Sequence, residues 1–538
     1  MSILDRPERR RRLVDRIRGN LRYAAGLGGF LRETLNEDQA TALVREQLER
    51  RGESFLRILE LGVYARPLSP YRRLLKHARI EFEDVARLVR QEGVEETLRI
   101  LRGSGVYVTL EEFKGRAPIR RPGLEFVTHP WDFDNPLLAG HYVARTGASR
   151  GVGSRVLIDL DLLTQEAAYA RHLLVGNNAL GRPIAVWYPA PPNSSGLKWV
   201  FRTMKLGCTP ERWFSQSRTV GLTRDARAAG FAHYTFLASR FLGRPSPRVR
   251  YVPQEQAAIV ARWLAAKKAA GVPGVLVTTP SSGVRVCAAA ASERIDIARS
   301  LFVVGSEPFT SPKAEAFARV GVQGVANYAM TELGTIAYGC AAPLDPDDVH
   351  VFTDKVAVIA TGKEVGAGGA IVPALILTTL LPSCPKLMLN TEVGDYAILE
   401  ERDCGCHLGR LGLTTHLRRV LSYEKLTSEG VTFLGSDLLE LVDRVLPARF
   451  GGHPADYQLV EEEERGLPLV SVVASPRLGS FDEAALVAAV LDVLASSPAG
   501  ELMANQWRQG RTLRVARRDP YVTRAPKILP LHVRRDGR

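Results

Sequence analysis

The chain has 538 residues, with 72 Lys and Arg against 58 Asp and Glu, and a formal net charge of +14. Hydrophobic residues make up 45% and charged residues 24%, which excludes a disordered chain, a collagen and a disulfide scaffold. The basic balance permits binding to nucleic acid or to an anionic surface without establishing either. The sequence has no long apolar run and no secretory signal, and its six cysteines favour a reducing compartment, so we expect a cytoplasmic protein without a membrane span.

The chain is expected to fall into three parts. Apolar positions recur three to four residues apart over 43–61 and 85–101, which predicts a mainly helical lead-in over 1–125. From 126 onward short apolar runs alternate with helical stretches, a pattern typical of an α/β domain. The expected strands there cover 274–279, 300–304, 324–328 and 374–380, and a helix is expected over 254–270.

The last 120 residues repeat the pattern on a smaller scale. Helices are expected over 437–446 and 482–495, and strands over 467–474 and 512–516. This size suits a compact α+β domain.

A glycine-rich segment at 146–153 (TGASRGVG) imitates the phosphate-binding turn of short-chain dehydrogenases. Those enzymes need a Tyr four residues before a catalytic Lys, and none of the 12 Lys in this chain has one. No Gly-Lys-Ser/Thr follows the glycines, so a Walker loop is excluded as well. The remaining interpretations are a polyphosphate-binding loop, with amides, hydroxyls and two arginines, or a plain surface turn.

Four further segments follow this loop in order: 305–310 (GSEPFT), 327–334 (NYAMTELG), 390–395 (NTEVGD) and 523–527 (TRAPK). With 69–74 (SPYRRL) and 430–436 (GVTFLGS), this order resembles the adenylate-forming superfamily of acyl-CoA synthetases, and its phenylacetate–CoA ligase branch in particular. The resemblance implies a large α/β adenylation domain over 126–418 and a small, mobile α+β lid over 419–538.

The resemblance also implies roles for individual residues. Glu332 would ligate Mg²⁺, Thr331 would bond the α-phosphate of ATP, and Lys527 would bridge that phosphate and the carboxylate of the acid. Asp395 would hold the ribose hydroxyls, Tyr328 would stack near the adenine, and Arg419 would contact the ribose. The remaining nucleotide-binding candidates are Thr146, Gly147, Ser149, Gly151, Gly305, Glu307 and Pro308.

The chain departs from the family pattern at several points. The phosphate loop ends without a lysine, Val393 stands where Thr is usual, and Pro526 stands where Gly precedes the lysine. The hinge element at 417–422 (LRRVLS) is degraded. Since domain rotation about this hinge builds the thioester-forming site in the superfamily, these changes bear more on the second half-reaction than on the first.

Cysteines suggest a second site. Cys340, Cys404 and Cys406 supply three thiolates, and His350, with His407 as the alternative, supplies an imidazole. This donor set suits tetrahedral, structural Zn²⁺. Some members of the resembled branch have a similar arrangement. The alternative is four unconnected reduced residues.

We therefore expect an enzyme that activates a carboxylic acid with ATP and Mg²⁺ and transfers the acyl group to coenzyme A. An aryl or otherwise apolar acid is expected because residues 288–291 and Phe309 would line a pocket with little charge. One alternative keeps the adenylation and changes the acceptor to a carrier-protein thiol or an amine. Another is a non-catalytic, nucleic-acid-binding or scaffold homologue, although no nucleic acid is expected as partner of the enzyme.

Overall fold

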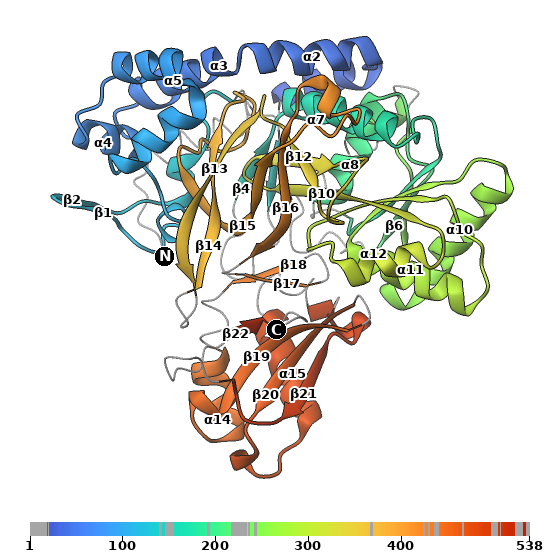
Figure 1. Ribbon diagram of the computed structural model, residues 1–538. Helices are drawn as coiled ribbons and strands as arrows, with labels where there is room; N and C mark the ends of the chain where they lie inside the picture. Colours follow the sequence, from blue (N-terminus) through green and yellow to red (C-terminus); the bar gives the residue numbers. More distant parts are fainter. Residues whose placement is uncertain are drawn as a thin grey trace.

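The computed structural model describes most of the chain (Figure 1). The described residues are 19, 21–138, 142–145, 155–190, 194–216, 234, 237–241, 245–365, 370–422, 425–428, 431–434, 441–464, 467–495, 504–505, 507–521 and 531–533.

A 12-stranded sheet forms the centre of the large part, in the order β13-β14-β15-β16-β12-β11-β10-β9-β8-β5-β6-β7. Six neighbouring strands are parallel: β7 (Val249–Tyr251), β6 (Arg212–Ser215), β5 (Ile184–Trp187), β8 (Val275–Thr278), β9 (Leu301–Gly305) and β10 (Gln323–Met330). The other strands pair antiparallel: β11 (Gly334–Gly339), β12 (Val349–Val351), β16 (Thr415–Ser422), β15 (Thr391–Glu401), β14 (Ala370–Thr379) and β13 (Val356–Val365).

Helices cover both faces of the parallel half. Side chains of a strand alternate between its faces, so Leu301 and Val303 of β9 join one core and Phe302 and Val304 the other. The first core includes α7 (Leu160–Gly176) and α8 (Ser194–Lys205). The second includes α10 (Ala257–Ala269), α11 (Pro280–Ser292) and α12 (Ser311–Ala318).

The strand order reverses between β5 and β8, because β6 and β7 continue to one side of β5 and β8, β9 and β10 to the other. In doubly wound sheets, ligands bind outside the carboxyl ends of the strands at such a reversal. We call this side of the sheet the carboxyl edge.

Most of the N-terminal helices pack beside the antiparallel half, and the first of them packs on α7 (Figure 1). They are α2 (Glu37–Glu49), α3 (Arg51–Ile58), a π-helical turn (Leu59–Tyr64), α4 (Pro70–His77), α5 (Phe82–Gly103) and α6 (Leu110–Phe113). Two hairpins follow, β1 (Ile119–Arg121) with β2 (Leu124–Phe126), and β3 (Tyr142–Arg145) with β4 (Arg155–Ile158).

A smaller α+β part ends the chain and lies below the large sheet in Figure 1. Its sheet has the order β21-β20-β19-β22, formed by Leu513–Arg517, Leu467–Ala474, Tyr457–Glu464 and Leu531–Val533. Helices α14 (Leu446–Phe450) and α15 (Glu483–Ala495) pack on it around a separate core. The hairpin β17 (Lys425–Ser428) and β18 (Val431–Leu434) precedes this part in the chain. The predicted fold class, α/β with a large first part and a small α+β second part, is confirmed.

Some expected elements differ in detail. The single helix expected over 43–61 is two helices, α2 and α3, because Arg50 leaves the helical conformation (φ −97°, ψ 13°). Where a helix was expected over 437–446, the described residues form a π-helical turn (Leu441–Val445) that leads into α14. β16 runs across the expected boundary at 418/419, and the domain limits of 1–125, 126–418 and 419–538 stay predictions.

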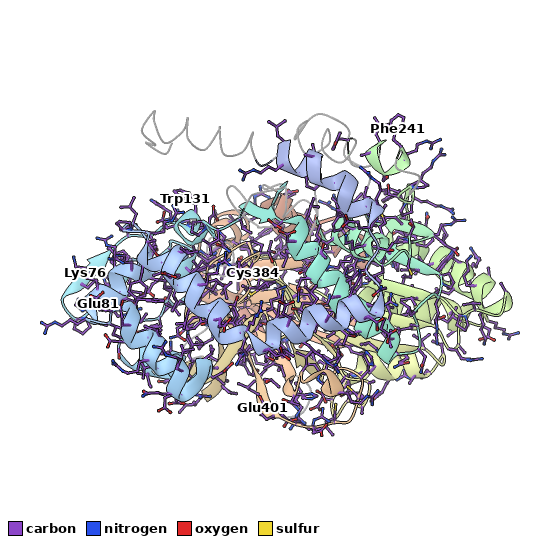
Figure 2. All side chains as sticks on the ribbon, turned by 90° about the horizontal axis from the view of Figure 1, so that it is seen from above. Lys76, Glu81, Trp131, Phe241, Cys384 and Glu401 are labelled. Atoms are coloured by element: carbon purple, nitrogen blue, oxygen red, sulfur yellow. The ribbon has the colours of Figure 1, made fainter. Side chains whose placement is uncertain are left out.

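Within the described residues, no helix is both long and apolar enough to cross a membrane. Seen from above, Cys384 lies in the interior and Phe241 at the periphery (Figure 2). Their side chains agree with these positions, since Cys384 is fully buried and Phe241 is 83% exposed.

Candidate active site

One buried carboxylate ties the carboxyl ends of β8 and β9 together. The backbone N–H and the hydroxyl of Ser281 donate to the two oxygens of Glu307 at 2.9 and 2.5 Å. Lys313 Nζ lies 3.5 Å from the same carboxylate, and both side chains are buried. Glu307 therefore braces the loop after β9, and its expected part in nucleotide binding stays a prediction.

Gly305 and Pro308 shape the same loop. A Cβ on Gly305 would lie 2.5 Å from the Asn327 carbonyl oxygen, so only glycine fits where β9 meets β10. The Pro308 carbonyl oxygen accepts a hydrogen bond from Lys313 Nζ at 2.8 Å. The loop thus has a fixed shape at the carboxyl edge, next to the point where the strand order reverses.

Tyr328 and Asp395 are far apart in the chain but lie together in the fold. Tyr328, on β10, donates its hydroxyl to Asp395 Oδ2, on β15, at 2.9 Å. Burial, and then the Asp395 charge, raise the pKa of Tyr328 well above its usual value, so the phenol stays protonated and can donate. Two of the predicted nucleotide-binding residues therefore form one unit.

Glu332 lies in the turn between β10 and β11, with its side chain only 8% exposed. Lys114 Nζ, just after α6, lies 2.5 Å from Glu332 Oε1. The Glu332 backbone carbonyl accepts from the Lys386 N–H at 3.0 Å. No motif or spacing in the sequence marks Lys114 as a partner of Glu332. The catalytic roles predicted for Thr331 and Glu332 stay predictions.

A second carboxylate lies beneath this turn. Glu166, on α7, accepts from the Thr335 N–H at 2.7 Å and from Arg202 Nε at 3.0 Å, and Lys355 Nζ lies 3.3 Å away. Burial by itself would raise the pKa of Glu166, but the neighbouring cations outweigh it and lower that pKa to about 2. Gly334 has φ +79°, and a Cβ there would lie 2.0 Å from Glu166 Oε1, which explains the glycine that ends the 327–334 motif.

Asp354 completes this buried group of charges. It accepts from the Tyr169 hydroxyl at 2.5 Å and from Gln165 Nε2 at 3.0 Å. Burial is the largest effect on Asp354 and raises its pKa to about 6, although Lys355 acts in the opposite direction. We refer to the following residues together as the charged cluster: Lys114, Glu166, Lys198, Arg202, Glu332, Asp354 and Lys355.

Arg419 does not join these groups. Its guanidinium lies 3.4 Å from Asp345 and is 62% exposed, and its backbone N–H donates to Asp347 at 2.9 Å. The structure places this arginine on β16 with φ +55°, directed to Asp345. The expected contact with a ribose stays a prediction.

Several predicted residues lie outside the described part of the chain. These are Thr146, Gly147, Ser149 and Gly151 of the glycine-rich loop, and Lys527. The strands on either side of that loop are described, and Arg145 of β3 pairs with Arg155 of β4.

The residues named for the expected apolar acid pocket are partly packed and partly exposed, and the pocket stays a prediction. Phe309 is buried and packs on Phe317, with ring centroids 5.3 Å apart. Ala288 and Ala291 are exposed on α11, while Ala290 belongs to the core. Within this run, Ala289 and Ala290 pack on the core, whereas Ala288 and Ala291 do not.

The predicted cysteines and His350 do converge. Sγ atoms of Cys340, Cys404 and Cys406 and one ring nitrogen of His350 lie within 4.8 Å of one another. His350 Nδ1 is 2.6 Å from the Leu413 carbonyl oxygen, which leaves Nε2 facing Cys406 at 3.1 Å and Cys404 at 3.6 Å. Despite burial, hydrogen bonds from Cys340 and His350 hold the pKa of Cys406 well below that of an ordinary thiol. Three sulfurs and an oriented imidazole fit a tetrahedral Zn²⁺ site.

A second layer of polar residues surrounds this cysteine–histidine cluster. Asp348 lies 2.7 Å from His416 Nδ1 and is paired with Arg402. His407, the alternative ligand, instead bonds His172 Nδ1 at 3.0 Å. The structure therefore favours His350 over His407 as the fourth donor. Sequence reasoning missed Asp348 and His416, because nothing in their spacing marks them.

The cysteine–histidine cluster lies away from the carboxyl edge. Cys340 follows the end of β11, while Glu332 precedes its start. The cluster borders β16, which carries the hinge residues 417–422, because His350 pairs with His416 and Val349 pairs with Leu417.

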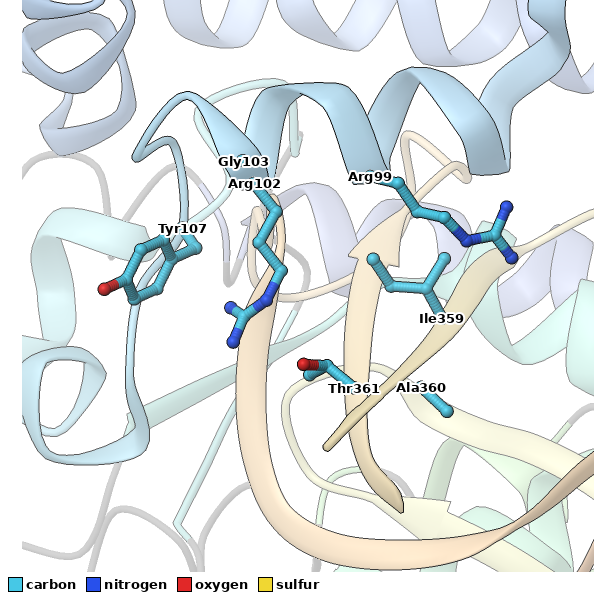
Figure 3. Close-up of a pocket in the computed structure, with 7 residues that line it drawn as sticks. All are labelled: Arg99, Arg102, Gly103, Tyr107, Ile359, Ala360 and Thr361. Carbon is cyan, nitrogen blue, oxygen red and sulfur yellow. The ribbon is translucent and has the colours of Figure 1, made fainter. Parts of the chain in front are cut away.

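A separate open cavity of about 480 Å³ lies at the end of α5, beside β13 (Figure 3). Arg102 lies 4.6 Å from the Tyr107 ring centroid and 3.4 Å from Glu392, and Arg99 pairs with Glu96. Both cations of this cavity thus have a carboxylate partner within the protein.

Comparisons with known proteins support the fold. No protein-family model and no curated protein matches the chain. Among solved structures, 2-hydroxyisobutyryl-CoA ligase, in complex with 2-HIB-AMP and CoA in the thioesterification state, aligns with a TM-score of 0.55 at 13% identity, covering 94% of this chain and 92% of that chain. The same ligase in the postadenylation state with 2-HIB-AMP gives 0.46 at 13% identity, over 91% and 90%. An o-succinylbenzoate CoA synthetase from Bacillus subtilis gives 0.38 at 13% identity, over 73% and 68%.

At 13% identity, the first alignment shows the fold alone. That fold is the one of 2-hydroxyisobutyryl-CoA ligase.

Proposed function

We propose that the protein activates a carboxylic acid with ATP, forms an acyl-adenylate and transfers the acyl group to coenzyme A. The observation that carries this proposal is the Tyr328–Asp395 pair at 2.9 Å, which joins two segments of the resembled pattern above the turn that holds Glu332. A carboxylate held by a protonated phenol can accept bonds from ribose hydroxyls. The fold shared with 2-hydroxyisobutyryl-CoA ligase supports the same reaction class.

The proposed cofactors are ATP, Mg²⁺ and coenzyme A, with Zn²⁺ as a structural ion. Glu332 is the proposed Mg²⁺ ligand, a role that requires its carboxylate to leave Lys114 or to share it with the ion. Lys527 and Thr331 are the proposed catalytic partners. Zn²⁺ is assigned to Cys340, His350, Cys404 and Cys406.

The finer assignment is a phenylacetate–CoA ligase-like enzyme acting on an aryl or otherwise apolar acid in the cytoplasm. The motif order supports the branch, and six free cysteines suit a reducing compartment. A carrier-protein thiol or an amine is the alternative acceptor, motivated by the degraded hinge at 417–422.

ATP–pyrophosphate exchange across a panel of aryl, arylacetic and fatty acids tests the first half-reaction. We expect exchange with at least one acid and a loss of about a hundredfold or more in Glu332→Gln. Unchanged exchange in that variant would contradict the role of Glu332. Product formation with coenzyme A against holo-carrier protein then tests the acceptor, and product without coenzyme A would overturn that part of the proposal.

A further inference from the structure

The charged cluster contains one cation that the protein itself does not pair. Lys198 lies on α8 and is only 8% exposed. Among the described residues, no acceptor or ion-pair partner lies within bonding distance of its ammonium, although the charges of Glu166 and Glu332 both act on it. Buried ammonium groups are costly unless they are paired.

The other members of the cluster all have partners. Lys114 pairs with Glu332, Arg202 and Lys355 share Glu166, and Asp354 accepts from a tyrosine and a glutamine. Four cations therefore face three carboxylates, and the surplus positive charge is that of Lys198.

The position of Lys198 places this charge toward the carboxyl edge. Residues four apart on a helix share a face, so Lys198 lies one turn before Arg202, on the side of α8 that faces Glu166. In the crossover from β5, the strand ends and the helix begins at the carboxyl edge. Lys198 is thus closer to this edge than Arg202 is.

We infer that Lys198 binds an anionic oxygen of a substrate at the carboxyl edge, either a phosphate oxygen of a nucleotide or the carboxylate of the acid. This inference rests on the proposed function and adds a substrate-binding residue to it. Both sources have the same chemistry, an oxyanion that would pair with the surplus ammonium. Burial, helped by repulsion from Arg202 and Lys355, outweighs the attraction of Glu166 and lowers the pKa of Lys198 to about 8, which still leaves the group charged at neutral pH.

Lys205 provides a matched control on the same helix. It is similarly buried, at 6% exposed, but its Nζ lies 3.3 Å from the Phe30 carbonyl oxygen and 5.0 Å from the Phe30 ring centroid. Lys205 is therefore a structural lysine, and Lys198 is not.

The test measures the Tm of the full-length protein with inorganic pyrophosphate or with phenylacetate, for wild type, Lys198→Met and Lys205→Met. We expect at least one anion to raise the wild-type Tm and to bind about ten- to a hundredfold more weakly to Lys198→Met. Without ligand, Lys198→Met should keep or raise the Tm, because it removes an unpaired buried charge. Lys205→Met should lower the Tm and keep the anion response.

The pattern across the two probes identifies the source of the oxyanion. Loss of the pyrophosphate response alone assigns Lys198 to phosphate, and loss of the phenylacetate response alone assigns it to the acid. The inference is overturned if neither anion raises the wild-type Tm, or if Lys198→Met keeps both responses. Either result is separate from the proposed function, which stands or fails on pyrophosphate exchange in the wild type.

Discussion

The two ends of β11 hold two buried polar clusters that are organised differently. At the end of the strand, the cysteine–histidine cluster brings four donors together around one point. At its start, the charged cluster distributes seven charges over several elements, and one ammonium, that of Lys198, has no bonding partner among the described residues. β11 has six residues, so about 20 Å of strand separates the two.

This difference is the one expected between a structural metal site and the substrate-binding site that we propose. Donors that converge on one point can be satisfied by a single small ion, which then holds β11, β12 and the 404–406 turn together. Charges that are only partly paired await a larger ligand that supplies the missing oxygens. Electrostatic catalysis uses groups of this second kind, fixed before the substrate arrives.

Loss of a cysteine from the cysteine–histidine cluster should have the largest effect on stability. We expect Cys406→Ser to remove the ion and to lower the free energy of unfolding by about 4 kcal/mol or more, since the loss of a structural metal is among the most destabilising changes. Calorimetry together with metal analysis of the purified protein measures both effects.

Cys208→Ser is the control, because Cys208 is half-buried and outside the cluster. It should keep one zinc per chain and the wild-type Tm. If the wild-type protein contained no zinc and chelators did not change its Tm, the cysteine–histidine cluster would not be a structural zinc site.

Asp354 tests whether burying the charges of the charged cluster costs stability. Its pKa is raised from 3.8 to about 6, so its stabilising contribution is complete below pH 3.8 and is lost as the pH rises through about 6. The full change is about 3 kcal/mol. We expect wild type to lose stability relative to Asp354→Asn between about pH 4 and pH 7, as followed by calorimetry.

Asp296→Asn serves as a control for this pH series. Asp296 is exposed, and hydrogen bonds from Lys268 lower its pKa. The variant should therefore show no loss of the kind expected for Asp354. If the difference in free energy of unfolding between wild type and Asp354→Asn did not change with pH, burial of the Asp354 charge would carry no cost, and the charged cluster would be as fully paired as the cysteine–histidine cluster.

Asp395 tests the proposed nucleotide-binding role of the Tyr328–Asp395 pair. Asp395→Asn should weaken ATP binding by about ten- to a hundredfold, because bonds to a charged group are worth about 1.5–3 kcal/mol. Tyr328→Phe removes only the phenol that orients Asp395 and should have a smaller effect. Titration calorimetry with ATP measures both. Equal, wild-type affinities would separate this pair from nucleotide binding.

The cysteine–histidine cluster could be predicted from the sequence more fully than the charged cluster and its surroundings. The cysteine–histidine cluster could be predicted because metal ligands are rare residue types with a meaningful spacing, and all four converge. Tyr328 and Asp395 were predicted from motif order, although their direct contact was not. Glu166, Arg202 and Lys355 were missed, because ordinary charged residues give no sign in the sequence that they will be buried together.

The expected apolar pocket stays a prediction, and the sequence pattern could not decide it for a related reason. A run of small residues has the same appearance whether it lines a cavity or packs a helix, and here α11 uses Ala289 and Ala290 for packing. Similarly, periodicity over 43–61 located helix but could not show that the backbone breaks at Arg50.

The smallest effect is expected where the small C-terminal part contacts the loop after β9 at the carboxyl edge. Glu463, on β19, accepts from the Thr310 hydroxyl at 2.6 and 2.7 Å and lies 3.6 Å from Lys313 Nζ, which also contacts Glu307. The carboxyl edge is therefore bonded to the small part through the loop after β9. Glu463→Gln keeps a bond from Thr310 but loses the ion pair, which should weaken docking by about 1 kcal/mol or less.

Amide hydrogen exchange over 305–313 should then be up to about fivefold faster in Glu463→Gln than in wild type. The neighbouring Glu462 pairs with Arg514 and Arg518 inside the small part, so Glu462→Gln is the matched control and should leave exchange at 305–313 unchanged. Exchange at the cysteine–histidine cluster should change in neither variant, since that end of β11 has no contact with Glu463 among the described residues. If exchange rose at both ends, β11 would transmit the undocking, and the two clusters would have to be treated as one coupled system instead of a structural metal site and a proposed substrate-binding site.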